Sequence, residues 1–97
     1  MISASVSGIT FCNVSLQVWN ELNSGTVLEL RREQTNKWDK NAIEVLYEGK
    51  RIGYIEKEIA GQIASHMGEM KCLVVSKFGI PTNKPVLAVS IELSRED

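Results

Sequence analysis

Hydrophobic and polar residues alternate along most of the chain, which is typical of β-strands that bury one face. The alternation predicts about six strands, at residues 2–11, 26–32, 42–48, 51–55, 71–78 and 86–93. Glu48-Gly49-Lys50 separates two of them and predicts a tight hairpin turn. Gly8 interrupts the first strand, where we expect a bulge or a close approach of another backbone segment.

The hydrophobic period changes to about four residues at positions 56–67. There EKEIAGQIASHM predicts an amphipathic helix of about three turns, with Gly68 as its stop. Residues 14–22 allow either a short helix or an irregular loop, because β-branched residues weaken the helical pattern. Short strands, tight turns and one late helix predict a mostly β fold, a closed or nearly closed barrel of about six strands.

Length and composition indicate a single globular domain, which we expect to span residues 1–97. The chain has 97 residues, of which 43% are hydrophobic and 24% are charged. No apolar run approaches the ~20 residues that cross a bilayer, and MISASVSGITF lacks the features of a signal peptide. We therefore expect a cytoplasmic protein without a membrane partner.

Charge and side-chain chemistry narrow the function classes. A net charge of −1 argues against a general duplex-binding protein, although a small pocket for one or two nucleotides is compatible with it. Cys12 and Cys72 lie far apart and His66 is the only histidine, so we expect no metal site, two reduced core or strand cysteines and a structural histidine. Known catalytic motifs are lacking, so we expect neither an enzyme nor a cofactor.

The stretch RREQTNKWDKNAI, residues 31–43, gathers Asn36, Trp38 and Asp39 in one loop. In the simpler interpretation the polar residues only shape the turn and the indole covers a barrel end. In the functional interpretation the loop forms a pocket for the end of a nucleic acid strand. A carboxylate can accept a hydrogen bond from a terminal hydroxyl and repel a phosphate, and a base stacked on an indole gains ~1–3 kcal/mol. The residues alone leave both interpretations open.

Further candidates lie outside this loop, and each also has a simpler explanation. Lys57 begins the predicted helix, where it could help to bind an anion, or it is a solvated surface lysine. Tyr54 could stack on a base or pack within its strand. Arg31 and Arg32 are adjacent on one strand, so they face opposite sides and at least one is expected at the surface.

Four stretches form an ordered series of motifs: VSGITF, LELRREQTNKWDKNAIEV, KRIGYIEKEIAGQIA and VVSKFG. The second is similar in spacing to L-x-R-E-P-x-N-P-Y-D-x-N-A-I-x-V, and the third to I-G-Y-I-P followed by a helix. With these motifs the chain resembles a HIRAN domain over about residues 4–93. The resemblance implies a modified OB-like barrel of about six strands with one or two helices.

The resemblance also implies a non-catalytic domain that binds single-stranded DNA by its free 3′-hydroxyl end, in DNA repair or replication-fork processing. By matching positions, Asp39 would bind the terminal hydroxyl, and Asn36 and Trp38 would shape the pocket. The other implied nucleic-acid contacts are Tyr54 and Lys57 on the sugar and phosphate side, Phe78 at the base, and Thr10 and Phe11. The expected partners are a DNA 3′ end and a helicase, nuclease or other repair protein, with the domain itself a monomer.

The sequence departs from the family at two places. Thr10, Phe11 and Cys12 stand where a DNA-binding member has Arg-Tyr-Tyr, so only the phenylalanine keeps a stacking side chain. Gln34 and Lys37 stand where the family has prolines. Together with the acidic pI of about 5.8, these differences favour an alternative, a protein-interaction module on an OB-like barrel.

Overall fold

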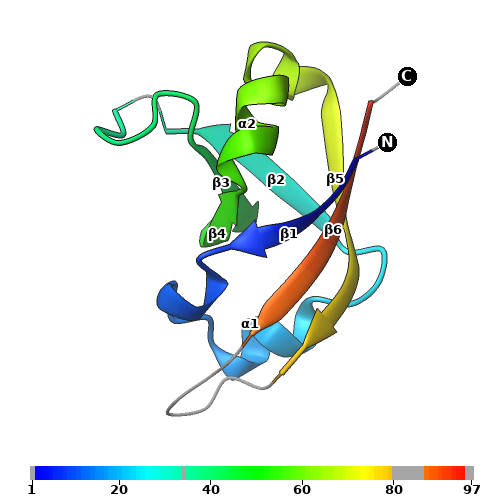
Figure 1. Ribbon diagram of the computed structural model, residues 1–97. Coiled ribbons are helices and arrows are strands. Elements are labelled where there is room, and N and C mark those ends of the chain that lie inside the picture. The colour runs from blue at the N-terminus through cyan, green and yellow to red at the C-terminus, as the bar shows by residue number, and fades with distance from the viewer. Residues whose placement is uncertain (1, 34, 80–86, 96–97) are drawn as a thin grey trace.

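Six antiparallel strands form one closed barrel in the computed structural model, which describes residues 2–33, 35–79 and 87–95 (Figure 1). Around the barrel the strands follow the order β1-β4-β3-β2-β5-β6. Their bounds are β1 Ile2–Ser7, β2 Val27–Arg32, β3 Ile43–Tyr47, β4 Lys50–Ile55, β5 Met70–Phe78 and β6 Ala88–Arg95. The predicted fold class, a mostly β barrel of about six strands with one or two helices, is confirmed.

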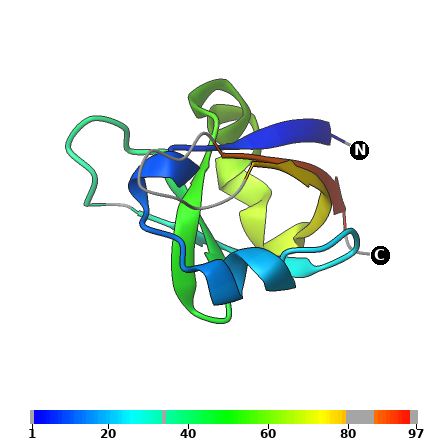
Figure 2. The same ribbon diagram turned by 90° about the horizontal axis from the view of Figure 1, so that it is seen from below.

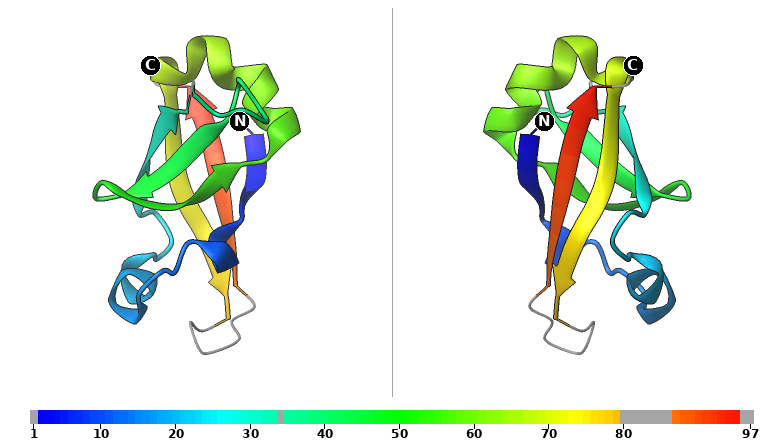
Figure 3. Two further views of the ribbon diagram at one scale, coloured as in Figure 1. Left: turned by 90° about the vertical axis from the view of Figure 1, so that its left-hand side faces the viewer. Right: turned by 90° about the vertical axis from the view of Figure 1, so that its right-hand side faces the viewer.

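The two ends of the barrel carry different helices (Figures 1 and 3). One end carries α2, Lys57–Ile63, which continues as the 3₁₀ helix η2, Ala64–Glu69. The 3₁₀ helix η1, Ile9–Phe11, and the short helix α1, Leu16–Glu21, lie toward the other end. The region of 14–22 is therefore helical, and Ser15 explains its start, because its Oγ accepts the Val18 N–H at 3.1 Å as an N-cap.

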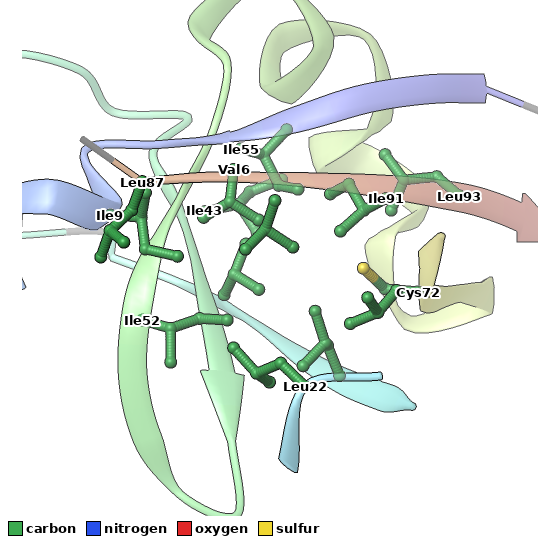
Figure 4. Close-up of a cluster of buried hydrophobic side chains, with 14 of the residues drawn as sticks. Val6, Ile9, Leu22, Ile43, Ile52, Ile55, Cys72, Leu87, Ile91 and Leu93 are labelled. Carbon is green, nitrogen blue, oxygen red and sulfur yellow. The ribbon is translucent and has the colours of Figure 1, made fainter. Parts of the chain in front are cut away.

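A single hydrophobic cluster fills the barrel interior (Figure 4). It receives alternate residues of the strands, such as Ile43 and Val45, both 0% exposed, and the inner faces of both helices. From α1, Trp19 is 3% exposed, and its indole N–H donates to the Gly79 carbonyl at 2.9 Å. The residue that follows β5 thereby holds α1 against the barrel.

The hairpin between β3 and β4 forms as predicted. Glu48 and Gly49 both have positive φ, 47° and 81°, which is the conformation of a two-residue turn that matches strand twist. The pairing then shifts by one residue, because Leu46 lies opposite Arg51 while Val45 lies opposite Gly53. This bulge at position 52 interrupts the alternation, so that β4 turns residues three apart to the same side.

Two predicted elements were partly wrong. The strand expected at 2–11 ends at Ser7, since Gly8, with φ 73°, turns the chain into η1; a Cβ at Gly8 would meet nothing within 4 Å, so no close approach occurs there. The helix expected at 56–67 is α-helical only to residue 63. Its continuation tightens into η2 and is kinked at His66, because the chain enters β5 at once without a loop.

Other corrections concern single positions. Val27 in the strand predicted at 26–32 is 62% exposed, so the buried face of β2 begins at Leu28. The last strand, expected at 86–93, begins at residue 88 and runs to Arg95, which pairs with Met70. The stretch between the last two predicted strands, residues 79–85, lies outside the described residues apart from Gly79.

The two cysteines differ in environment. Cys72 lies in the core at 1% exposure, as predicted, and burial raises the pKa of its thiol to about 12. Cys12 is half-buried and follows η1, so its assignment to the core or a strand was wrong; the early end of the first strand moved it out of the sheet.

We expect a thiol reagent at pH 8 to modify Cys12 in the folded protein and to leave Cys72 unmodified, because the thiolate is the reactive form. Peptide mapping after alkylation would identify the modified residue. Modification of Cys72 without denaturant, at the rate of the unfolded chain, would contradict its burial.

Candidate nucleic-acid interface

A surface cavity of about 390 Å³ lies where the loop after β2 meets the ends of β1 and β4. Figures 1 and 2 show this loop, the 33–42 loop, which is described except for residue 34; residues 35–42 extend sideways from the barrel. Five of the eight candidate residues line the cavity: Asn36, Trp38, Asp39, Tyr54 and Lys57. The other lining residues, which were not candidates, are Ser7, Ala42 and Ile55. The fold thus brings two separate sequence motifs to one place.

Side chains of the loop hold its own backbone. The Asn36 Oδ1 accepts the N–H groups of Trp38 at 2.8 Å and Asp39 at 3.0 Å, and the Asp39 Oδ1 accepts the Asn41 N–H at 2.9 Å. The expectation that these residues shape the turn is confirmed. Among the described residues Oδ2 of Asp39 has no hydrogen-bond partner, while Oδ1 of the same carboxylate fixes the turn at the cavity.

Glu33 fastens the loop to the barrel. Its N–H donates to the Ala42 carbonyl at 2.8 Å and closes the base of the loop. Its carboxylate accepts Nδ2 of Asn36 at 3.2 Å on one oxygen and the Tyr54 hydroxyl at 2.8 Å on the other. Glu33 therefore links the turn that carries Asp39 to strand β4.

Arg51 completes this arrangement. Its guanidinium donates to the Tyr54 oxygen at 2.8 Å and lies 5.4 Å from the centre of the same ring. Both side chains lie on the outside of the barrel because the bulge at position 52 turns them to the same side. The tyrosine hydroxyl is thus hydrogen-bonded to both Glu33 and Arg51.

The ionisation of this group reflects its hydrogen bonds. The bond from Tyr54 is the main cause that holds the pKa of Glu33 below its ordinary value. Burial, followed by the bond to Glu33, raises the pKa of the Tyr54 hydroxyl. The pair is therefore ionised acid and protonated phenol at neutral pH, which is the state that the hydrogen bond requires.

Acid should weaken the hydrogen bonds of the Glu33 carboxylate to Asn36 and Tyr54. Because the pKa of Glu33 is lowered in the folded state, its stabilising contribution is complete above the ordinary carboxylate pKa of 4.5 and is lost as the pH falls through the lowered value. Urea unfolding at a series of pH values should thus show a larger acid-dependent loss of stability for the wild type than for Glu33→Gln. Equal losses below pH 4.5 would contradict this role of Glu33.

The other candidates are placed as follows. Trp38 is 90% exposed, so the expectation that it covers a barrel end was wrong; the loop carries it outward, onto the rim of the cavity. Lys57 is exposed at the first residue of α2. Thr10 lies half-buried in η1 and Phe78 is 71% exposed at the end of β5, and neither lines the cavity. The backbone of Phe11 belongs to η1, and its side chain lies outside the described part.

A row of paired residues runs from the cavity across four strands. Ser7 of β1 pairs with Tyr54, which pairs with Glu44 of β3, which pairs with Arg31 of β2. Glu44 is only 6% exposed and forms an ion pair with Arg31 at 2.6 Å. Arg31 therefore neutralises a buried carboxylate, and Arg32, on the other side of β2, donates to the Lys40 carbonyl at 3.1 Å and supports the loop.

Sequence reasoning missed Glu33, Arg51 and Ser7. Glu33 carried a usable signal, because an acidic residue directly after β2 and three positions before Asn36 is placed to bond that amide. Arg51 carried none, since without the bulge it would face away from Tyr54. Ser7 could be found only from the pairing of β1 with β4, which joins distant parts of the sequence.

Within the described residues, no three His, Cys, Asp or Glu side chains are grouped so as to hold a metal ion. In the same part of the chain, no helix has the length and apolar character that crossing a membrane requires.

Two solved structures share this fold. The HIRAN domain of human HLTF superposes with a TM-score of 0.69 at 24% identity, and the match covers 99% of this chain and 76% of that one. A protein from Lactobacillus plantarum superposes with a TM-score of 0.68 at 20% identity, covering 98% and 94% of the two chains. No curated protein matches the sequence. The HIRAN domain model matches residues 1–95, and the chain therefore belongs to the HIRAN domain family, known as a family of DNA-binding modules.

Proposed function

We propose that this domain binds single-stranded DNA without catalysis and recognises a free 3′-hydroxyl end in the cavity between the 33–42 loop and β4. The observation that carries the proposal is the convergence of Asp39, Trp38, Tyr54 and Lys57 on one cavity of about 390 Å³. These side chains offer one acceptor, two aromatic surfaces and one cation. A terminal nucleoside with its phosphate needs this combination of groups.

Each group has a distinct role in the proposed complex. Oδ2 of Asp39 accepts the hydrogen bond of the terminal 3′-hydroxyl, and its negative charge repels a 3′-phosphate or a continuing strand. The exposed ring of Trp38 stacks on the terminal base, and Lys57 neutralises the phosphate on the 5′ side of that nucleotide. Glu33 and Arg51 hold the Tyr54 ring beside the sugar.

Such a domain would serve DNA repair or replication-fork processing. End recognition without a catalytic group suits a monomeric module that brings a strand end to a helicase, a nuclease or another repair protein. Its proposed location is the cytoplasm, or the nucleoid or nucleus if it belongs to a DNA-repair protein.

Fluorescence anisotropy at low salt would test the proposal with a short oligonucleotide labelled at its 5′ end. Three ligands would be compared: the strand with a 3′-hydroxyl, the same strand with a 3′-phosphate, and a blunt duplex. We expect the free hydroxyl strand to bind most tightly. Equal binding of the two single strands, or no binding by protein whose fold is verified by circular dichroism, would overturn the proposal.

A second candidate function is a protein-interaction module. Two exposed apolar side chains away from the cavity favour it, Phe78 at 71% and Leu16 at 54% exposure. Figure 1 shows β5 ending near α1, on the opposite end of the barrel from α2. This candidate predicts a partner complex that survives nuclease treatment and the Asp39→Asn change, and that is lost with Phe78→Ser.

A further inference from the structure

Strand β4 lines a second cavity at its other end. This cavity has a volume of about 280 Å³, and β4 contributes Lys50, Arg51 and Ile52 to it. The opposite wall comes from the turn between η1 and α1, residues 12–15, and from Val18. Among the described residues that line it, two are cations and none is acidic, so the cavity favours an anion.

Arg51 connects this cavity to the first one. Its guanidinium donates to the hydroxyl of Tyr54, which lines the first cavity, while Arg51 itself lines the second. Its side chain is 48% exposed, and a guanidinium has five N–H donors, so donors remain for a ligand after the bond to Tyr54 is made. Glu33, at 3.9 Å, balances part of this charge, and Lys50 adds a second cation beside it.

The distance between the cavities suits a continuous strand. The six residues of β4 extend ~20 Å. Successive phosphates of one DNA strand are ~3.4 Å apart along the axis of a B-form helix, so several nucleotides cover this length. Lys57 follows one end of β4 and Lys50 begins the other, so a ligand lying along this strand would pass a cation, the Tyr54 ring and two further cations.

We propose that the second cavity is a phosphate-binding subsite for the nucleotides that precede the 3′-terminal one, with Arg51 and Lys50 as its cations. This inference rests on the proposed function and extends it, because it gives the bound strand a direction along β4, from the 3′ end at the loop toward the β3–β4 hairpin. It also implies that affinity depends on strand length beyond the terminal nucleotide.

Oligothymidylates of two and six nucleotides, each with a 5′ label and a free 3′-hydroxyl, would test the subsite. We expect Lys50→Gln and Arg51→Gln each to weaken binding of the hexamer roughly threefold to tenfold and to reduce the salt dependence by about 0.7 in slope. Binding of the dinucleotide should change less than twofold with Lys50→Gln, because that side chain reaches only the second cavity. Lys71→Gln, at an exposed lysine on β5, is the matched control and should change neither.

The outcomes separate the two proposals. If the wild type prefers a 3′-hydroxyl but neither variant affects the hexamer, the subsite is refuted and end recognition stands. If Arg51→Gln weakens both lengths equally while Lys50→Gln has no effect, Arg51 acts only by holding Tyr54, and the subsite is again refuted. If the folded wild type binds neither oligonucleotide, both proposals are refuted.

Discussion

Replacing Asp39 by asparagine should abolish the preference of this domain for a free 3′-hydroxyl end over a 3′-phosphate. The amide retains an oxygen to accept the Asn41 N–H, now 2.9 Å from Oδ1, so the turn keeps its shape. What is lost is the negative charge at the cavity. A hydrogen bond to a charged group contributes ~1.5–3 kcal/mol, against ~0.5–1.5 kcal/mol for a neutral one. Binding of the hydroxyl strand should therefore weaken about tenfold, and the phosphate strand should bind better than before.

Anisotropy titrations with both ends would measure this change, with Glu29→Gln as the matched control. Glu29 is exposed on β2 and does not line the cavity, and its replacement by glutamine removes the same charge as the Asp39 change. Asp39→Ala would also remove the acceptor of the Asn41 N–H, so it tests charge and loop shape together. A variant Asp39→Asn that discriminates between the two ends as strongly as the wild type would show that another group reads the terminus.

Gly53→Ala should be the most destabilising single-methyl addition that the described structure offers. A Cβ at this position would overlap Cγ1 of Val6 and lie 2.7 Å from the Ser7 carbonyl oxygen, which is backbone and cannot rotate away. Strands β1 and β4 would have to separate. We expect a loss of roughly 2–3 kcal/mol in the free energy of unfolding, in the range seen for overpacked interiors, and weaker DNA binding because Ser7 lines the cavity.

Gly61→Ala is the natural control for this experiment. Gly61 is exposed within α2, and an added Cβ there would meet nothing within 4 Å. Alanine favours helix over glycine by ~1 kcal/mol, so this variant should be more stable than the wild type. Urea denaturation of the two variants should shift the midpoint in opposite directions. A Gly53→Ala protein as stable as the wild type would mean that β1 and β4 are not as closely packed as described.

The hydrophobic pattern predicted the barrel because a strand that buries one face shows alternating hydrophobic and polar residues in its own sequence. The period-two runs predicted β2 and β3 to within one residue at each end, and the Glu48-Gly49 turn predicted β4 as the hairpin partner of β3. The pairing of strands that are distant in the chain produces no such local sequence pattern. The closure of β1 onto β6, and the bulge that lets Arg51 meet Tyr54, depend on tertiary packing and could not be read from the sequence.

The same distinction holds for the site. Asn36, Trp38 and Asp39 were predicted together because they are close in sequence. Tyr54 and Lys57 were separate candidates from their side-chain chemistry and their positions, and the motif resemblance supported both. All five line one cavity. Phe78 was assigned by resemblance alone and lies elsewhere. The network of Glu33, Tyr54 and Arg51 joins the residue that follows β2 to two residues of β4, so only the fold reveals it.

The position of β1 has a consequence for the order of folding. This strand pairs with β4 on one side and with β6 on the other, and its partners include Leu93, almost the whole chain away from Ile2. Contacts this distant in sequence form late, because they require the largest loops to close. Since Ser7 of β1 forms part of the cavity, the complete site exists only after β1 has paired with β4 and β6 and closed the barrel. A ligand held there would thus stabilise the whole domain against global unfolding, by linkage, and not only the loop that it touches.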